Sequence, residues 1–228
     1  MPAMAILLNL ETATTNCSVS ISKGNEVISL KENNAMSYSH SEQLHLFIKE
    51  ALQEASLSFS DLNAVAISKG PGSYTGLRIG VSAAKGLCFS LDLPLISVPT
   101  LESMAHQVQL GEGELVIPVL DARSMEVYSA VFDHQYQEIR ETRAEVIDEN
   151  SFADYVSEYN VYVVGSGAEK CKEILGFPYF HFDASIVPSA KEMAPIAFEK
   201  YKKGQFENVA YFEPYYLKDF VIQSKKKV

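Results

Sequence analysis

The feature that most restricts the fold of this chain is a glycine-rich turn, GPGSYTGLRIG, at residues 70–80. An apolar, strand-like run at 62–68 leads into the turn, and a helical run at 77–89 leads out of it. Between a strand and a helix N-terminus, backbone N–H groups converge and the helix dipole adds partial positive charge, so such a turn can hold a phosphate group. The turn therefore predicts a strand–turn–helix unit that is either a phosphate site or a packing device.

The residues before this turn predict a mixed sheet and a covering helix. Three antiparallel strands are expected first, with a hairpin turn at Lys23-Gly24-Asn25. Ser39 and Glu42 have the spacing of a capping box, and the apolar residues that follow recur at helical spacing. In the first half, strands are expected at 5–10, 18–22, 26–30, 62–68 and 94–98, and helices at 44–55, 77–89 and 101–109.

The pattern starts again after a short polar linker at 111–114, where the sequence is GEGE. Two halves, each with strands followed by a strand, a glycine turn and a helix, predict a two-lobed α/β fold of the actin, Hsp70 and sugar-kinase type. A generic two-lobed α/β protein is the alternative. The expected lobes are 1–110 and 115–228, with a last helix or tail that can cross back to the first lobe. In the second half, strands are expected at 115–120, 125–132, 138–146 and 161–164, a glycine turn at 165–168, and helices at 168–175 and 188–203.

Composition restricts the classes of function. The formal net charge of −10 argues against a protein that binds nucleic acid alone, because phosphate binding relies on clustered lysines and arginines. The three cysteines are far apart in sequence, which favours buried, reduced thiols, and no apolar run approaches the ~18 residues of a membrane helix. The N-terminus lacks the basic region and cleavage site of a signal peptide, so a cytoplasmic location is expected, with Met1 or Met4 as the native start.

Four segments together resemble the bacterial TsaB family, which has the older name YeaZ. They are LNLETATTNCSVSI at 8–21, the glycine turn, DARSMEVY at 121–128 and PYYL at 214–217. The resemblance extends over 5–218, nearly the whole chain. It implies an actin/Hsp70/sugar-kinase-like (ASKHA) fold and a non-catalytic scaffold role in forming threonylcarbamoyladenosine at the adenosine next to the anticodon of tRNA.

The same resemblance implies a set of partners. TsaB-like proteins are similar to the catalytic subunit TsaD, lack its active site and pair with it. The ATPase TsaE docks on that pair, and TsaB-like proteins also self-associate as homodimers. Contact with tRNA is then expected only through the complex, and no membrane partner is expected. The alternative is an independent enzyme of the same fold, either a small-molecule kinase or a metallopeptidase.

The residues that would carry catalysis are altered in this sequence. The catalytic relative builds a metal site on a His-x-x-x-His helix start, where two histidines one turn apart can share a metal, but the corresponding positions here are Thr100 and Met104. Kinases of this fold use an Asp-x-Gly-Ser/Thr hairpin, whereas this sequence has Glu11 and, in place of the glycine, Ala13. No metal, cofactor or catalytic residue is therefore expected, and weak nucleotide binding is left open.

Small residues in the helix after the glycine turn predict a partner surface. A glycine inside a helix costs roughly 1 kcal/mol relative to alanine, so several of them need a packing reason. The small residues either pack the helix tightly on its own sheet or let the helix of a partner protein approach closely. The resemblance to the TsaB family favours the second alternative. The predicted partner interface consists of Gly76, Arg78, Gly80, Ala83, Ala84 and Leu87.

Two charged sites outside this helix are expected to be structural. Asp121, Arg123 and Glu126 are expected to form an ion pair that fixes the turn between two strands, rather than a kinase-type catalytic group. Glu102 stands at a helix start, where the dipole favours a carboxylate. Neither site is expected to carry chemistry.

Overall fold

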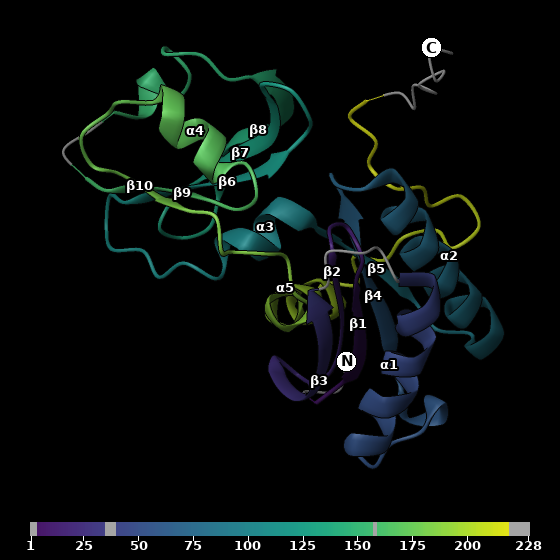
Figure 1. The fold of residues 1–228 in the computed structure, drawn as a ribbon. Coiled ribbons are helices and arrows are strands. Elements are labelled where there is room, and N and C mark those ends of the chain that lie inside the picture. The colour runs from purple at the N-terminus through teal and green to yellow at the C-terminus, as the bar shows by residue number, and fades with distance from the viewer. Residues whose placement is uncertain (1–3, 35–39, 157–158, 219–228) are drawn as a thin grey trace, which may run out of the picture.

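The computed structural model describes residues 4–34, 40–156 and 159–218. Two five-stranded mixed sheets, each covered by helices, lie side by side (Figure 1). This arrangement is the two-lobed α/β architecture that the alternation of strands and helices in the sequence predicts.

The first sheet has the strand order β3-β2-β1-β4-β5. Its first three strands pair antiparallel through hairpins, whereas β1, β4 and β5 pair parallel through helical crossovers. The elements in chain order are β1 (Ile6–Glu11), β2 (Asn16–Lys23), β3 (Glu26–Asn34), α1 (His40–Glu54), a 3₁₀ turn (Phe59–Asp61), β4 (Ala64–Gly70), α2 (Tyr74–Leu91) and β5 (Leu95–Pro99).

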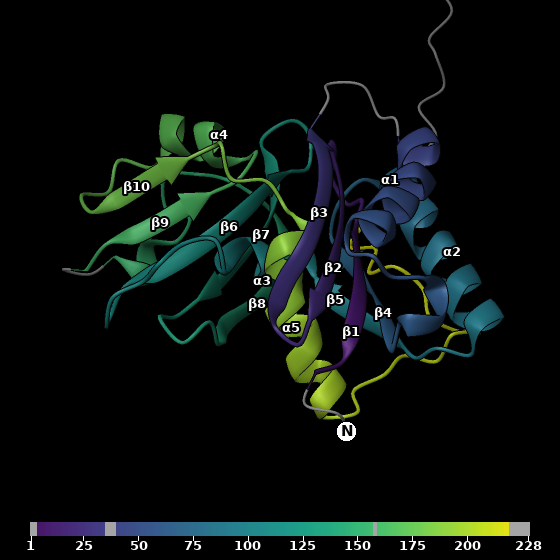
Figure 2. The ribbon, with the colours of Figure 1, turned by 90° about the horizontal axis from the view of Figure 1, so that it is seen from below.

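Each face of the first sheet is buried by different helices, because β1, β4 and β5 carry apolar residues on both sides. The helices α1 and α2 cover one face, where Leu44 and Val81 share a core with Leu8. The opposite face is covered by α5 (Ala190–Lys202), where Met193 shares a second core with β1, β4 and β5. Figure 2 shows α5 on one side of the first strands and α1 and α2 on the other. The last helix of the chain therefore completes the core of the first sheet.

The second sheet repeats the topology of the first, with the order β10-β9-β6-β7-β8. Its first three strands are antiparallel, and β6, β9 and β10 are parallel. The helices α3 and α4 cover opposite faces, each over its own apolar core. The elements are α3 (Thr100–Ala105), β6 (Leu115–Asp121), β7 (Glu126–Phe132), β8 (Glu138–Val146), a 3₁₀ turn (Ala153–Tyr155), β9 (Val161–Val164), α4 (Ala168–Ile174) and β10 (Phe180–Asp183).

Several helix and strand ends differ from the sequence prediction by a few residues, and the larger differences are at α3 and β10. The helix α3 ends at Ala105 rather than at residue 109, because the N–H groups of Gln107 and Val108 donate to carbonyls three residues back and tighten the chain into turns. The sequence does not predict β10, since four residues are too few to show a clear alternation. The predicted capping residue Ser39 lies outside the described residues, and α1 is described from His40.

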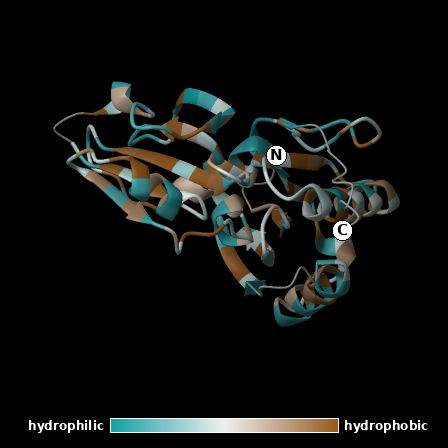
Figure 3. Cartoon of the chain, turned by 45° about the horizontal axis from the view of Figure 1, so that its top comes forward, coloured by the Kyte–Doolittle hydropathy of each residue, from teal (hydrophilic) through white to brown (hydrophobic). Residues whose placement is uncertain are grey.

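The distribution of hydrophobic residues and the state of the cysteines agree with the sequence analysis. Hydrophobic residues concentrate in the strands of both sheets, and many loops and outer helix faces are hydrophilic (Figure 3). Cys17, Cys88 and Cys171 are buried free thiols, and burial raises the pKa of Cys17 to about 11 and those of the other two to about 12. No helix in the described part of the chain is long and apolar enough to cross a membrane.

Candidate functional site

The glycine turn packs against the tip of the β1–β2 hairpin. The Ser73 N–H donates to the Ala13 carbonyl at 2.6 Å. A Cβ atom on Gly72 would overlap that same carbonyl, and a Cβ atom on Gly76 would overlap the carbonyl of Thr12. The turn is rich in glycine because two stretches of backbone approach each other here more closely than side chains allow.

The N-terminus of α2 lies directly behind this contact, and the N–H groups of Gly76 and Leu77 in its first turn have partners within the chain. Ser73 Oγ accepts the Gly76 N–H at 3.2 Å, and the Ser73 carbonyl accepts the Leu77 N–H at 2.9 Å. One turn further on, a Cβ atom on Gly80 would overlap Thr12 Oγ1. The hairpin tip therefore lies against the helix start, where a phosphate would need open backbone N–H groups.

Glu11, at the position where a kinase of this fold carries aspartate, is fully buried. Its Oε1 accepts the Ala13 N–H at 2.5 Å and the Ser68 hydroxyl at 2.9 Å. Its Oε2 has no hydrogen-bond partner among the described residues. Burial raises the pKa of Glu11 to about 7, against the opposing effect of these hydrogen bonds. A carboxyl group held in this way supports the hairpin and is a poor ligand for a hydrated divalent metal ion.

The second glycine turn is filled by the side chain of Met104. Gly165 has a φ of +111°, and a Cβ atom there would overlap both Met104 Cε and the Val119 carbonyl. Gly167 N–H donates to the same Val119 carbonyl at 3.1 Å. Thr100, the other residue at the altered metal motif, is fully buried and its hydroxyl has no partner among the described residues. Both motif positions are thus part of the interior packing around α3.

The histidines are dispersed. His40 Nε2 lies 2.7 Å from the Thr14 carbonyl, His106 stacks on Tyr136 with ring centroids 4.2 Å apart, and His181 Nε2 lies 2.9 Å from Asn160 Oδ1. Among residues 4–34, 40–156 and 159–218, no three or more His, Cys, Asp and Glu side chains gather as a metal site. Glu102 is largely buried at the start of α3, and burial raises its pKa despite the nearby charge of Lys200.

The predicted ion pair between Asp121, Arg123 and Glu126 is wrong. Asp121 Oδ1 pairs with Lys170 Nζ at 2.8 Å, and Arg123 contributes only its backbone N–H to Asp121, at 2.7 Å. Burial opposes ionisation of Asp121, but the hydrogen bonds from Lys170 and Arg123 and the lysine charge hold its pKa below the ordinary value. Glu126 pairs with Lys218. The turn is closed by its own backbone hydrogen bonds, and its two carboxylates pair with lysines far away in the sequence rather than with the Arg123 side chain.

The residues of the predicted partner interface divide into two groups. Gly76, Gly80 and Ala84 are buried and face the first sheet. Arg78 is exposed, while Ala83 and Leu87 are half-buried beside the first core. The small-residue spacing is therefore used for packing within the chain, and only Arg78, Ala83 and Leu87 remain accessible to a partner.

Two exposed apolar side chains on α1 and α2 are absent from the sequence prediction. Leu46 on α1 is 50% exposed, and Phe89 on α2 is 87% exposed. Leu46 lies off the apolar stripe formed by Leu44 and Ile48, so its position on the helix could have revealed it as an outward-facing apolar residue. Single exposed apolar residues are common, but these two lie on neighbouring helices that cover the same face of the sheet.

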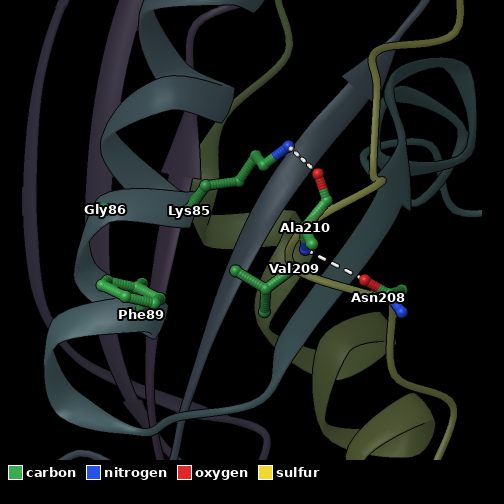
Figure 4. A pocket seen from close by; sticks show the side chains of 6 residues that line it. All are labelled: Lys85, Gly86, Phe89, Asn208, Val209 and Ala210. Carbon is green, nitrogen blue, oxygen red and sulfur yellow. Dashed lines mark hydrogen bonds between the residues drawn. The ribbon is translucent and has the colours of Figure 1, made fainter.

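A groove of about 590 Å³ lies between α2 and the C-terminal segment, defined here as residues 205–218. Figure 4 shows Phe89 on the helix side and Val209 on the segment side. Lys85 Nζ spans from the helix to the segment, donating to the carbonyls of Ala210 at 3.2 Å and Phe212 at 2.9 Å. The groove is lined by Lys85, Gly86, Phe89, Asn208, Val209 and Ala210.

The C-terminal segment crosses from the first lobe to the second. It begins beside β5, where Glu207 N–H donates to the Leu95 carbonyl at 2.8 Å. It then passes the glycine turn, where Tyr215 N–H donates to the Lys69 carbonyl at 2.7 Å. Lys218 ends the described part by pairing with Glu126 in the second lobe. The segment thus joins both lobes over the glycine turn.

Comparison with protein families and with known sequences gives matches over most of the chain. The family model described as "TsaD: tRNA N6-adenosine threonylcarbamoyltransferase" matches residues 33–221. The Escherichia coli tRNA threonylcarbamoyladenosine biosynthesis protein TsaB is 30% identical, and the alignment covers 96% of this chain and 97% of that protein.

Comparison with solved structures gives similarity of fold. The crystal structure of a Pseudomonas aeruginosa protein described as similar to peptidase YEAZ has a TM-score of 0.83 and 26% identity, and covers 94% of this chain and 100% of its own. An activator of 2-hydroxyisocaproyl-CoA dehydratase from Clostridium difficile has a TM-score of 0.50 and 9% identity, with coverage of 89% and 97%. Together with the repeated sheet topology, these likenesses confirm the predicted ASKHA-type fold.

Proposed function

We propose that this chain, which belongs to the TsaB (YeaZ) family of tRNA threonylcarbamoyladenosine biosynthesis proteins, serves that modification as a non-catalytic scaffold subunit. In this proposal it pairs with a TsaD-type catalytic subunit in the cytoplasm and helps to recruit a TsaE-type ATPase. It forms a homodimer when alone, and it reaches tRNA through the complex, next to the anticodon.

The observation that carries the non-catalytic role is that both glycine turns are filled by the chain itself. The hairpin backbone at Thr12 and Ala13 lies against the first turn, and Met104 lies against Gly165 in the second. A nucleotide of an ASKHA enzyme needs open backbone at such turns, because its phosphates approach N–H groups directly. The filled turns support a role in binding partners rather than in phosphoryl transfer or metal-assisted hydrolysis.

The surface that we propose for the catalytic subunit is the outer side of α1 and α2. Leu46 on α1 and Phe89 on α2 supply exposed apolar area there, and Ala83 and Leu87 of α2 are half-buried beside the first core. Apolar and aromatic side chains of this kind form the centre of stable interfaces when a partner covers them. Gly80 and Ala84 are unsuitable for testing this surface because they are buried, so a large side chain there would disturb folding instead.

Replacing Leu46 or Phe89 with aspartate is expected to reduce co-purification of the TsaD-type subunit by at least about tenfold, since a charge would enter an apolar contact. Both side chains are exposed in the isolated chain, so its thermal midpoint should change little. Ile139→Asp is the matched control, because Ile139 is 48% exposed on β8 of the second lobe. Full binding by both variants, or equal loss with Ile139→Asp, would contradict the proposed surface.

The isolated chain is expected to show no turnover of ATP and to retain no stoichiometric zinc or iron after purification. The reason is that the first glycine turn is occupied and the metal motif holds Thr100 and Met104. Phosphate release and elemental analysis measure the two properties, with a TsaD-type protein as the positive control. Turnover of ATP by the chain alone would favour the rival function of an independent ASKHA-fold kinase, and a bound metal would favour a metallopeptidase.

A further inference from the structure

A cluster of tyrosines and cations lies where the C-terminal segment passes the glycine turn. We call it the tyrosine patch; it consists of Lys69, Tyr74, Arg78, Tyr215 and Tyr216. The rings of Tyr74 and Tyr216 are 4.9 Å apart between centroids and inclined by 36°. The Arg78 guanidinium lies 5.4 Å from the centroid of Tyr74 and donates to its hydroxyl at 3.0 Å. Lys69 Nζ lies 6.0 Å from the ring centroid of Tyr215. Rings and cations from three separate parts of the chain thus form one surface.

The tyrosine patch is partly accessible and carries two cations, Lys69 and Arg78. Tyr215 and Tyr216 are 42% and 39% exposed, and Arg78 is exposed as well. Within the described residues, no ion pair engages Arg78 or Lys69, although the protein carries a net charge of −10. Two carboxylates outside the tyrosine patch interact electrostatically with its members: Glu213 with Tyr216, and Glu102 with Lys69. Arg78 and Lys69 can therefore engage a negatively charged ligand without first breaking an ion pair.

The cationic surface continues toward the second lobe. Lys218 follows Tyr216 by two residues, and Arg123 is exposed in the β6–β7 turn. The charges of both act on the phenol of Tyr128, which places them near each other. Glu126 neutralises Lys218, so Arg123 is the cation of this pair that a ligand could engage.

We infer that the tyrosine patch binds a short single-stranded stretch of RNA, with bases stacked on Tyr215 and Tyr216 and phosphates held by Arg78 and Lys69. Single-stranded RNA offers the two surfaces required, namely unstacked base faces for aromatic rings and phosphates for cations. A duplex hides its base faces, and the carboxylates of an acidic protein segment would engage the cations without using the rings. The inference rests on the proposed function, because the RNA in question is the tRNA loop on which the TsaB family's modification acts.

The test uses the full chain in complex with its TsaD-type subunit and a short RNA stem–loop that carries a photoreactive uridine in the loop or, separately, in the stem. The wild-type chain should crosslink to the loop probe and not to the stem probe. Tyr216→Ala should lower the loop crosslink by about tenfold, whereas Tyr216→Phe should keep it, because the stacking ring remains. Tyr211→Ala is the matched control, since Tyr211 lies on the same segment and is 83% exposed outside the tyrosine patch.

Three results would overturn the inference. The first is an unchanged loop crosslink with Tyr216→Ala, and the second is equal crosslinking of the loop and stem probes. The third is loss of the catalytic subunit or the ATPase from the Tyr216→Ala complex, which would identify the tyrosine patch as a protein interface. If the wild-type chain fails to pair with the catalytic subunit, the proposed scaffold function fails separately. In that case the same two probes and three variants are tested on the isolated chain. A loop crosslink that falls with Tyr216→Ala supports the inference, and an unchanged crosslink overturns it.

Discussion

Replacing Gly76 with alanine is expected to lower the free energy of unfolding by up to about 2 kcal/mol. The new methyl group would overlap the backbone carbonyl of Thr12, and neither the hairpin nor α2 can retreat without breaking the packing between them. Overpacking of this kind costs about 1–3 kcal/mol, and the roughly 1 kcal/mol that alanine gains in helix propensity offsets only part of it. Urea denaturation of both proteins measures the difference.

The matched control is Gly86→Ala in the same helix. Gly86 is exposed, and a Cβ atom there meets nothing within 4 Å, so only the helix propensity changes. This variant should be more stable than the wild type by up to about 1 kcal/mol. If Gly76→Ala is as stable as Gly86→Ala, the close contact between hairpin and helix does not restrict residue 76.

Replacing Glu11 with glutamine is expected to stabilise the protein at alkaline pH relative to the wild type. The folded-state pKa of Glu11 is about 7 and the ordinary value is 4.5, so the folded protein holds a proton that the unfolded chain releases between these values. The free energy of unfolding of the wild type therefore falls as pH rises from 4.5 to 7. Above pH 7 the titration of Glu11 lowers it no further. The difference of about 2.5 pKa units corresponds to about 3 kcal/mol.

The measurement is a pair of urea titrations at several pH values between 4.5 and 8, for the wild type and Glu11→Gln. The gap between the two free energies of unfolding should widen by about 3 kcal/mol over this range. Glu42→Gln, which alters an exposed carboxylate in the first turn of α1, is measured alongside as the control for the loss of one carboxyl group. A constant gap between wild type and Glu11→Gln would show that Glu11 titrates alike in the folded and unfolded chains.

Most of the fold could be predicted because local patterns and topology agree. The glycine turn, the hairpin at Gly24 and the apolar runs predict the kinds and order of the strands and α-helices other than β10. The short strand β10 (Phe180–Asp183) could not be predicted in this way, because it forms by pairing with β9 rather than through an alternation of apolar and polar residues in its own sequence. Local sequence predicts an element best where the element's own residues determine it.

The candidate site was harder to predict because its contacts join residues distant in the sequence. The glycines at 76 and 80 indicate a close approach correctly, but the sequence cannot say whether the approaching backbone belongs to Thr12 or to a partner. Asp121 shows the same difficulty: its cation is Lys170, 49 residues away, rather than the neighbouring Arg123. The tyrosine patch likewise needs the C-terminal segment to return to the glycine turn, which no local pattern reveals.

The placement of α5 has a consequence for synthesis of the chain. The second sheet is built from one continuous stretch, 115–183, whereas the first sheet needs α5 (Ala190–Lys202) to cover the face that includes Leu7 and Ile96. As the ribosome makes the chain from its N-terminus, that apolar face stays bare until α5 emerges, after the whole second lobe. The lobe made first is thus the lobe finished last, and chains released before residue 190 would carry an uncovered sheet prone to aggregation.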